Sequence, residues 1–403
     1  MRKAIALCAA AGFVSGTASA QSTVLLYGIL DEGANYVSNA AGHHLYNLSS
    51  GVLNGSRWGL RVREDLGSGY GVIAVMENGF DVNTGKLGQG GLGFGRQAYV
   101  GLSSPYGTVT LGRQYDSVVD TLGLFEVGDQ WGGSMAAHPS DNDNFNNTNR
   151  VNNAIKYTSP VFHGVTATAL YSLGGVAGHT GRNQIWSAGV SYANGPLSLG
   201  AGYLNVRNPN TSFYGSGGTV AATVNEVPGS NFGASPVISG YASAHSLQVI
   251  GAGAAYTIGA LTLGTTYSNT QFRHLGDTSS GPVPAGGIAG TAKFDNVEAS
   301  VKYQFTPSFL IGAAYVYTRN SGADSKGGAH YNQASVGADY FLSKRTDVYL
   351  VGTYQRASGT ASAGRVARAG LKRVSPGARP HPTPRWGAHR PRGCCAGGPG
   401  TQG

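Results

Sequence analysis

The stretch VEASVKYQF, residues 297–305, decides the fold of this chain of 403 residues. Apolar side chains stand at every second position of it, and the residues between them are Glu298, Ser300, Lys302 and Gln304. Because successive side chains of a β-strand point to opposite faces, this alternation predicts a strand with one apolar and one polar face. The same period of two recurs, with no helical pattern in between, in residues 165–173, 186–192, 197–203, 261–267 and 334–342.

The connections between these segments alternate between short and long. Short turn sequences occupy residues 65–69, 193–195, 306–308 and 343–345. Long polar connections rich in Gly, Asn and Ser occupy residues 38–54, 82–92, 114–149, 207–243 and 274–291. Short turns on one side and long loops on the other are typical of a transmembrane up-and-down barrel with strands of about 10 residues.

Aromatic residues flank the short turns, at Tyr157, Phe162, Tyr192, Tyr256, Phe305, Phe309, Tyr340 and Phe341. They predict a girdle at the membrane interface, although ordinary apolar strand ends would give the same pattern. The fold class predicted is therefore all-β, an antiparallel transmembrane barrel closed on itself, because lipid offers no partners to unpaired backbone groups. About 15 strands are recognisable up to residue 355.

The charges are distributed unevenly along the chain. It has 28 Lys and Arg against 19 Asp and Glu, a net charge of +9, but eight of the basic residues lie in 357–403 and two are Arg2 and Lys3. The segment 21–356 is therefore close to neutral, which excludes the concentrated basic surface that nucleic-acid binding requires.

Both ends of the chain differ from its body. Residues 1–20, MRKAIALCAAAGFVSGTASA, have two cations, a short apolar stretch and a small-residue cleavage site. This is typical of a cleaved secretory signal peptide; an uncleaved anchor is the alternative, but the apolar stretch is too short to span a bilayer. Residues 357–403 contain six prolines, eight basic residues and no acid.

Proline cannot donate to a strand ladder, so we expect residues 357–403 to be a disordered basic tail that replaces a lost last strand. A change of reading frame near residue 359 explains the composition, and a functional basic tail is the alternative. The sequence thus predicts a signal peptide over 1–20, a barrel over 21–356 and an atypical tail over 357–403.

Several longer motifs resemble the general diffusion porins of Gram-negative bacteria in their β-proteobacterial form. They are LYGILDEG at 26–33, SRWGLRVREDLGSGYG at 56–71, GRQAYVGLSSPYGTVTLGRQYDS at 95–117 and RVNNAIKYTSP at 150–160. The resemblance implies a barrel of 16 strands in the outer membrane. It also implies a homotrimer and a third long loop that folds into the lumen and narrows it.

Candidate pore residues follow from strand parity and from this resemblance. In residues 57–63 three arginines alternate with Trp58, Leu60 and Val62, so the arginines should face water. The resemblance places Arg57, Arg96 and Arg150 on the wall at the constriction. The basic wall predicted is Arg57, Arg61, Arg96, Arg150 and Lys156, and the facing acids predicted are Glu77, Asp116, Glu126 and Asp129.

The function expected is passive diffusion of small hydrophilic solutes and ions, with mild anion preference because the wall arginines are better fixed than the loop acids. The alternative is an outer-membrane adhesin or receptor that acts through its long loops. The partners expected are outer-membrane lipid, lipopolysaccharide and the permeating solutes.

We expect no enzyme, no cofactor and no metal site. The glycine-rich segment 88–93 lacks the helix that a dinucleotide site needs, and His43 and His44 point apart as neighbours in sequence.

Overall fold

The computed structural model describes residues 22–40, 42–215, 232, 235–324, 327–362 and 369–380. The first nine strands are β1 (Thr23–Ile29), β2 (Glu32–Ala40), β3 (His43–Ser50), β4 (Arg57–Gly67), β5 (Tyr70–Gly79), β6 (Gln97–Ser104), β7 (Gly107–Gln114), β8 (Val151–Thr158) and β9 (Val165–Ser172). The other nine are β10 (Ile185–Asn194), β11 (Leu197–Arg207), β12 (Ser246–Ile258), β13 (Leu261–Leu275), β14 (Gly290–Thr306), β15 (Phe309–Asn320), β16 (Ala329–Phe341), β17 (Thr346–Gly359) and β18 (Ala369–Pro380). The predicted signal peptide lies outside the described residues.

Helical segments are short and lie in the connections. They are α1 (Ser117–Leu122), α2 (Pro209–Ser212), η1 (Gln89–Gly91), η2 (Gly123–Phe125), η3 (Val127–Asp129), η4 (Pro139–Asp141) and η5 (Ser239–Tyr241). Across the described part of the chain, every helix is too short or too polar to cross a bilayer.

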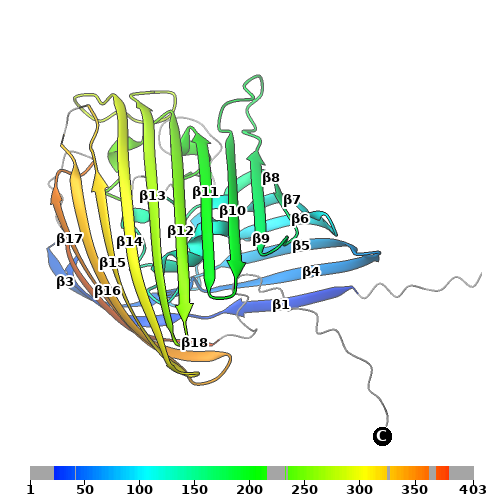
Figure 1. Ribbon diagram of the computed structural model, residues 1–403. Coiled ribbons are helices and arrows are strands. Elements are labelled where there is room, and N and C mark those ends of the chain that lie inside the picture. Colours follow the sequence, from blue (N-terminus) through cyan, green and yellow to red (C-terminus); the bar gives the residue numbers. More distant parts are fainter. Residues whose placement is uncertain are drawn as a thin grey trace, which may run out of the picture.

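All strands belong to one antiparallel sheet. The pairing runs from β1 to β4, then through each successive strand to β18, and from β18 to β2 and β3. The segments β1 and β2 are two halves of one long strand, and β3 and β4 are two halves of its partner, so the 18 strands correspond to 16. Figure 1 shows the sheet curving from the upright strands β10–β17 round to β4–β8. The prediction of an all-β up-and-down barrel is confirmed.

The connections alternate as the sequence predicted. Seven short ones occupy residues 68–69, 105–106, 159–164, 195–196, 259–260, 307–308 and 342–345. The long ones occupy residues 80–96, 115–150, 173–184, 208–245, 276–289, 321–328 and 360–368. One expected loop is different: most of the described residues in 38–54 are strand, because β2 and β3 pair as a hairpin.

The end of the barrel corrects an expectation. Strand β17 continues to Gly359, and the backbone of β18 pairs with β17 over its whole length and with β2 at four positions. The expected tail therefore contains the last strand, which includes Pro376 opposite Leu350. The physical reason is that the edges of β17 and β2 present backbone donors and acceptors, and the backbone of residues 369–380 supplies partners for them even though each proline removes one donor. Residues 363–368 and 381–403 lie outside the described residues.

The connection 115–150, which we call the inner loop, packs on the inner face of the wall. Helix α1 contacts β9, β10, β11 and β12. Glycines on these strands make room for it: a Cβ on Gly189 would lie 2.7 Å from Thr121, and one on Gly253 would lie 2.6 Å from Phe125. The core of the protein lies at this contact, with Leu122 and Phe125 almost fully buried, while residues such as Trp58 and Val190 are exposed on the outer face.

Candidate functional site

Strand β4 carries two arginines to the inner face of the wall. Its first residue, Arg57, pairs in register with Ile29 of β1 and Gly79 of β5, and Arg61 follows four residues later with the same parity. Trp58, of opposite parity, is 43% exposed on the outer face. Arg57 and Arg61 thus lie on the face opposite to Trp58, as side-chain parity predicts.

Glu77 of β5 lies between two guanidinium groups. Arg96 Nε is 2.8 Å from Glu77 Oε1, and Arg57 Nε is 3.8 Å from Glu77 Oε2. Tyr27 Oη donates a hydrogen bond of 2.9 Å to Glu77 Oε2. Both Glu77 and Arg96 are buried. A buried carboxylate of this kind needs its cations, because an unpaired buried charge costs several kcal/mol.

Tyr115 joins this group to Arg150. Its hydroxyl accepts hydrogen bonds from Arg96 Nη2 at 2.9 Å and from Arg150 Nη2 at 3.3 Å. The Arg150 guanidinium also lies 5.0 Å from the centre of the Tyr115 ring, a cation–π distance. Sequence reasoning missed Tyr115. The only signal was its place directly after the strand predicted before the long loop, in a motif that also contains Tyr99 and Tyr106.

The other two basic residues extend the same inner surface. The Arg61 guanidinium lies 5.1 Å from the centre of the Tyr27 ring. Lys156 Nζ forms an ion pair of 2.7 Å with Asp120 Oδ2 and donates to the Tyr115 carbonyl at 3.0 Å. The structure therefore brings together Arg57, Arg61, Arg96, Arg150, Lys156 and Glu77, linked through Tyr27 and Tyr115.

Asp129 is the predicted loop acid that lies opposite these cations with an exposed side chain. Asn147 donates to Asp129 Oδ1 at 2.9 Å and accepts from Arg150 Nη2 at 3.2 Å, so one amide connects the acid to the cationic wall. Arg57, Arg96 and Arg150 all act electrostatically on the Asp129 carboxylate.

Asp116 and Glu126 do not face the lumen, and the prediction that they do is wrong. Asp116 is fully buried and caps α1: its Oδ1 accepts from the backbone N–H groups of Val118 and Val119. Glu126 is fully buried and accepts from the backbone N–H of His138 at 2.8 Å. Burial raises the pKa of Asp116 to about 6 and that of Glu126 well above its ordinary value. An irregular loop has no side-chain period, so sequence could not show which acids point inward.

A buried ionisable cluster holds the inner loop to the far wall. His138 Nδ1 lies 2.7 Å from Asp143 Oδ2, and its Nε2 lies 3.7 Å from Glu298 Oε2 on β14. Glu298 Oε1 accepts from the backbone N–H of Val127 at 2.9 Å. Burial alone would lower the pKa of His138, but Asp143 and Glu126 raise it to about 10. The cluster fixes the position of the loop segment that carries Asp129.

No group of three or more His, Cys, Asp or Glu among the described residues is arranged to hold a metal ion. The glycine-rich segment 88–93 forms η1 and an irregular stretch before β6, and no longer helix follows it. The described part of this segment thus has the form of a loop that leads into a strand.

The sequence of this chain is similar to those of known proteins. A family model described as Gram-negative porin matches residues 4–360. An outer membrane porin protein of Bordetella pertussis is 28% identical, over 88% of this chain and 94% of that protein. Outer membrane porin protein 32 of Delftia acidovorans is 35% identical, over 47% of this chain and 55% of that protein.

Solved structures share the fold. An anion-selective porin from Comamonas acidovorans has a TM-score of 0.66 and 23% identity, covering 90% of this chain and all of that one. The trimer form of OmpT, an outer membrane protein of Vibrio cholerae, has a TM-score of 0.61 and 15% identity, covering 89% of this chain and 99% of that one.

Proposed function

This chain belongs to the family of Gram-negative porins, outer-membrane channels for passive diffusion, and on that premise we propose an arginine-lined constriction that mildly favours anions. Its basic side is Arg57, Arg61, Arg96, Arg150 and Lys156, with Glu77 among them, and its acidic side is Asp129 on the inner loop. Small hydrophilic solutes and ions would pass between these two sides. No catalytic step is part of the proposal.

The observation that carries this proposal is the balance of charge around Tyr115. Among the described residues, the five cations share this surface with the carboxylates of Glu77, Asp120 and Asp129. Asp116 and Glu126 stand apart from this group, because Asp116 caps α1 and Glu126 accepts a hydrogen bond from the backbone of His138 inside the loop. A surplus of fixed positive charge at a narrow passage attracts anions and repels cations.

The comparisons support the finer points of the proposal. The anion-selective porin from Comamonas acidovorans has the same fold, and we propose the same preference here. We also propose a homotrimer, as in the trimer form of the Vibrio cholerae protein, with outer-membrane lipid and lipopolysaccharide around it.

The reversal potential of the folded protein in a planar bilayer, under a gradient of KCl, tests the preference. We expect anions to be more permeant, and the ratio to fall towards one in Arg57→Gln, whose side chain is 20% exposed. A matched Lys86→Gln variant, at an exposed position between β5 and β6, should keep the wild-type ratio. Higher cation permeability in the wild-type protein would overturn the anion preference. If the protein is instead an adhesin or receptor that acts only through its loops, we expect no current.

A further inference from the structure

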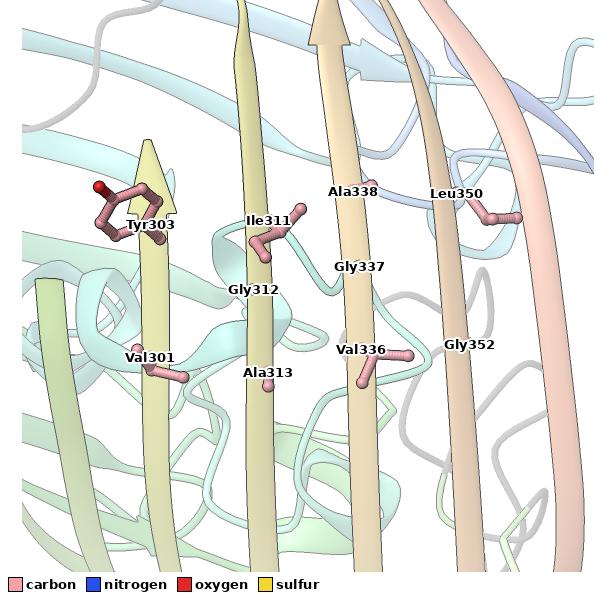
Figure 2. Close-up of a pocket in the computed structure, with 10 residues that line it drawn as sticks. All are labelled: Val301, Tyr303, Ile311, Gly312, Ala313, Val336, Gly337, Ala338, Leu350 and Gly352. Carbon is pink, nitrogen blue, oxygen red and sulfur yellow. The ribbon is translucent and has the colours of Figure 1, made fainter. Parts of the chain in front are cut away.

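The outer face of β14–β17 contains an apolar groove with a volume of about 550 Å³. Figure 2 shows its lining on four neighbouring strands. Small outward residues form its floor, at Ala313, Ala338 and Gly352, and larger ones, among them Val336 and Leu350, stand beside them. Val336 is 61% exposed and Leu350 is 50% exposed. In the outer membrane, this face of the barrel wall would therefore present an unfilled apolar groove to the lipid.

The groove arises from the register of the strands. Val336 of β16 lies opposite Gly352 of β17, and Ala338 lies opposite Ile311 of β15, so a small residue stands beside each large one. On the inner side of the same wall, the Trp131 ring packs against Gly312 and Gly337. At the groove, only the backbone of the sheet therefore separates the Trp131 ring from the outer face.

A belt of aromatic rings lies at the end of the groove nearest the short turns. Tyr303, which also lines the groove, has its ring centre 4.7 Å from that of Phe305, and Phe305 lies 5.7 Å from Phe309. Aromatic side chains favour the level of the lipid head groups, and the short turns of such barrels face the periplasm. The groove thus begins at the periplasmic interface and rises into the hydrocarbon region.

Two cations stand directly below the groove. Lys344 and Arg345 are exposed in the turn 342–345, which joins the two strands that carry the groove floor at Ala338 and Gly352. In the described residues, the other six short connections contain no Lys or Arg. From Arg345 to Leu350 is five residues of strand, about 17 Å. This is close to half of the roughly 30 Å hydrocarbon core, the length of one leaflet.

We propose that this groove is a binding site for an anionic phospholipid of the periplasmic leaflet. One acyl chain lies in the groove over Ala338 and Gly352, and the phosphate lies against Lys344 and Arg345. Along the wall, the apolar groove is followed by the belt of aromatic rings and then by the two cations. A phospholipid in the same leaflet has the same order, from its acyl chains through the interfacial region to its head group. The proposal rests on the outer-membrane location and not on the ion preference of the channel.

Native mass spectrometry of the folded protein, with added phosphatidylglycerol or phosphatidylethanolamine, tests the proposal. We expect a retained phosphatidylglycerol on each protomer and weaker retention of phosphatidylethanolamine. The Lys344→Ser, Arg345→Ser double variant should bind phosphatidylglycerol on the order of 20-fold more weakly, because each cation near a membrane surface contributes roughly a factor of five. Ala338→Phe, which fills the groove, should lose the adduct at the concentration that half-saturates the wild-type protein.

Matched controls separate the site from general effects. A Lys86→Ser, Arg182→Ser double variant removes the same charge from exposed positions on the long-loop side, and Ala201→Phe adds the same ring to an exposed position on β11. Both should bind phosphatidylglycerol as the wild-type protein does. Single-channel conductance of all four variants should stay at the wild-type level. A loss of lipid binding can then be told apart from a loss of channel function.

Trp131 provides an independent readout from the inner side of the wall. In the triple variant Trp58→Phe, Trp186→Phe, Trp386→Phe, Trp131 is the one tryptophan left, and its fluorescence should be quenched by phosphatidylglycerol with brominated acyl chains. Ala338→Phe should remove that quenching. Equal binding of both phospholipids by all variants would overturn the proposal. So would loss of protomer association in Ala338→Phe with unchanged lipid binding, which would make the groove a contact between copies of this chain.

Discussion

The hydroxyl of Tyr115 lies 2.9 Å from Arg96 Nη2 and 3.3 Å from Arg150 Nη2, so one phenol holds two guanidinium groups at a fixed separation. Arg96 belongs to the connection before β6 and Arg150 directly precedes β8. The two arginines are thus coupled through the first residue of the inner loop.

Tyr115→Phe should loosen Arg150 without removing a charge. We expect a loss of about 1–3 kcal/mol in stability, because the arginine donors lose a buried acceptor, and noisier single-channel currents. Thermal unfolding and bilayer recording measure the two effects. The matched change Tyr106→Phe, in an exposed turn, should alter neither. Identical behaviour of the two variants would show that Tyr115 does not position the arginines.

Glu77→Gln removes the negative charge between Arg57 and Arg96. We expect stronger anion preference, because the wall gains net positive charge, together with destabilisation of roughly 3–5 kcal/mol from the uncompensated buried cations. Reversal potential and thermal unfolding measure these effects. The double variant Glu77→Gln, Arg96→Gln should recover part of the stability, and a double variant no more stable than the single one would contradict the pairing.

Asp129 and Asp116 should behave differently although both are acids of the inner loop. Asp129→Asn should raise the ratio of anion to cation permeability, because its carboxylate is exposed opposite the arginines. Asp116→Ala should leave that ratio unchanged and cost about 1 kcal/mol, as the loss of a helix cap does. An effect of Asp116→Ala on selectivity equal to that of Asp129→Asn would contradict the burial of Asp116.

The His138 cluster predicts that docking of the inner loop depends on pH. Because the pKa of His138 is raised to about 10, its pairing with Asp143 stabilises the folded state fully below about 6.5 and is lost as pH rises through about 10. The pKa of Asp143 is lowered, so its contribution is lost in acid instead. We expect closing events in single-channel recordings to increase between pH 8 and pH 11.

His138→Asn serves as the control for this pH dependence. This variant lacks the imidazole that titrates. Its channels should therefore close frequently already at neutral pH, and the frequency of closing should change little up to pH 11. If the alkaline change persisted unaltered in His138→Asn, other groups would cause it.

Glycines on the strands that face the inner loop, such as Gly253, should not tolerate a larger side chain. Gly253→Ala places a Cβ 2.6 Å from Phe125, and we expect a cost of about 1–3 kcal/mol with altered conductance. Gly93→Ala meets nothing within 4 Å and should behave as the wild-type protein. Conductance and thermal unfolding of the two variants compare them directly, and equal values would mean that the loop does not pack on β12.

The sequence by itself determined the strands, the alternation of short and long connections and the faces of the wall. It placed Arg57 and Trp58 on opposite faces because side-chain parity is a local property of an extended backbone. The matching motifs also identified the family, and the comparisons confirm it.

Only the tertiary structure decided which acids face the arginines, how Tyr115 joins them and where the barrel ends. Glu126 and Asp129 are three residues apart, yet one is buried beside His138 and the other is exposed, because an irregular loop takes its orientation from the wall it packs on. Strand β18 likewise takes its pairing from the edges of β17 and β2 rather than from its own side-chain pattern.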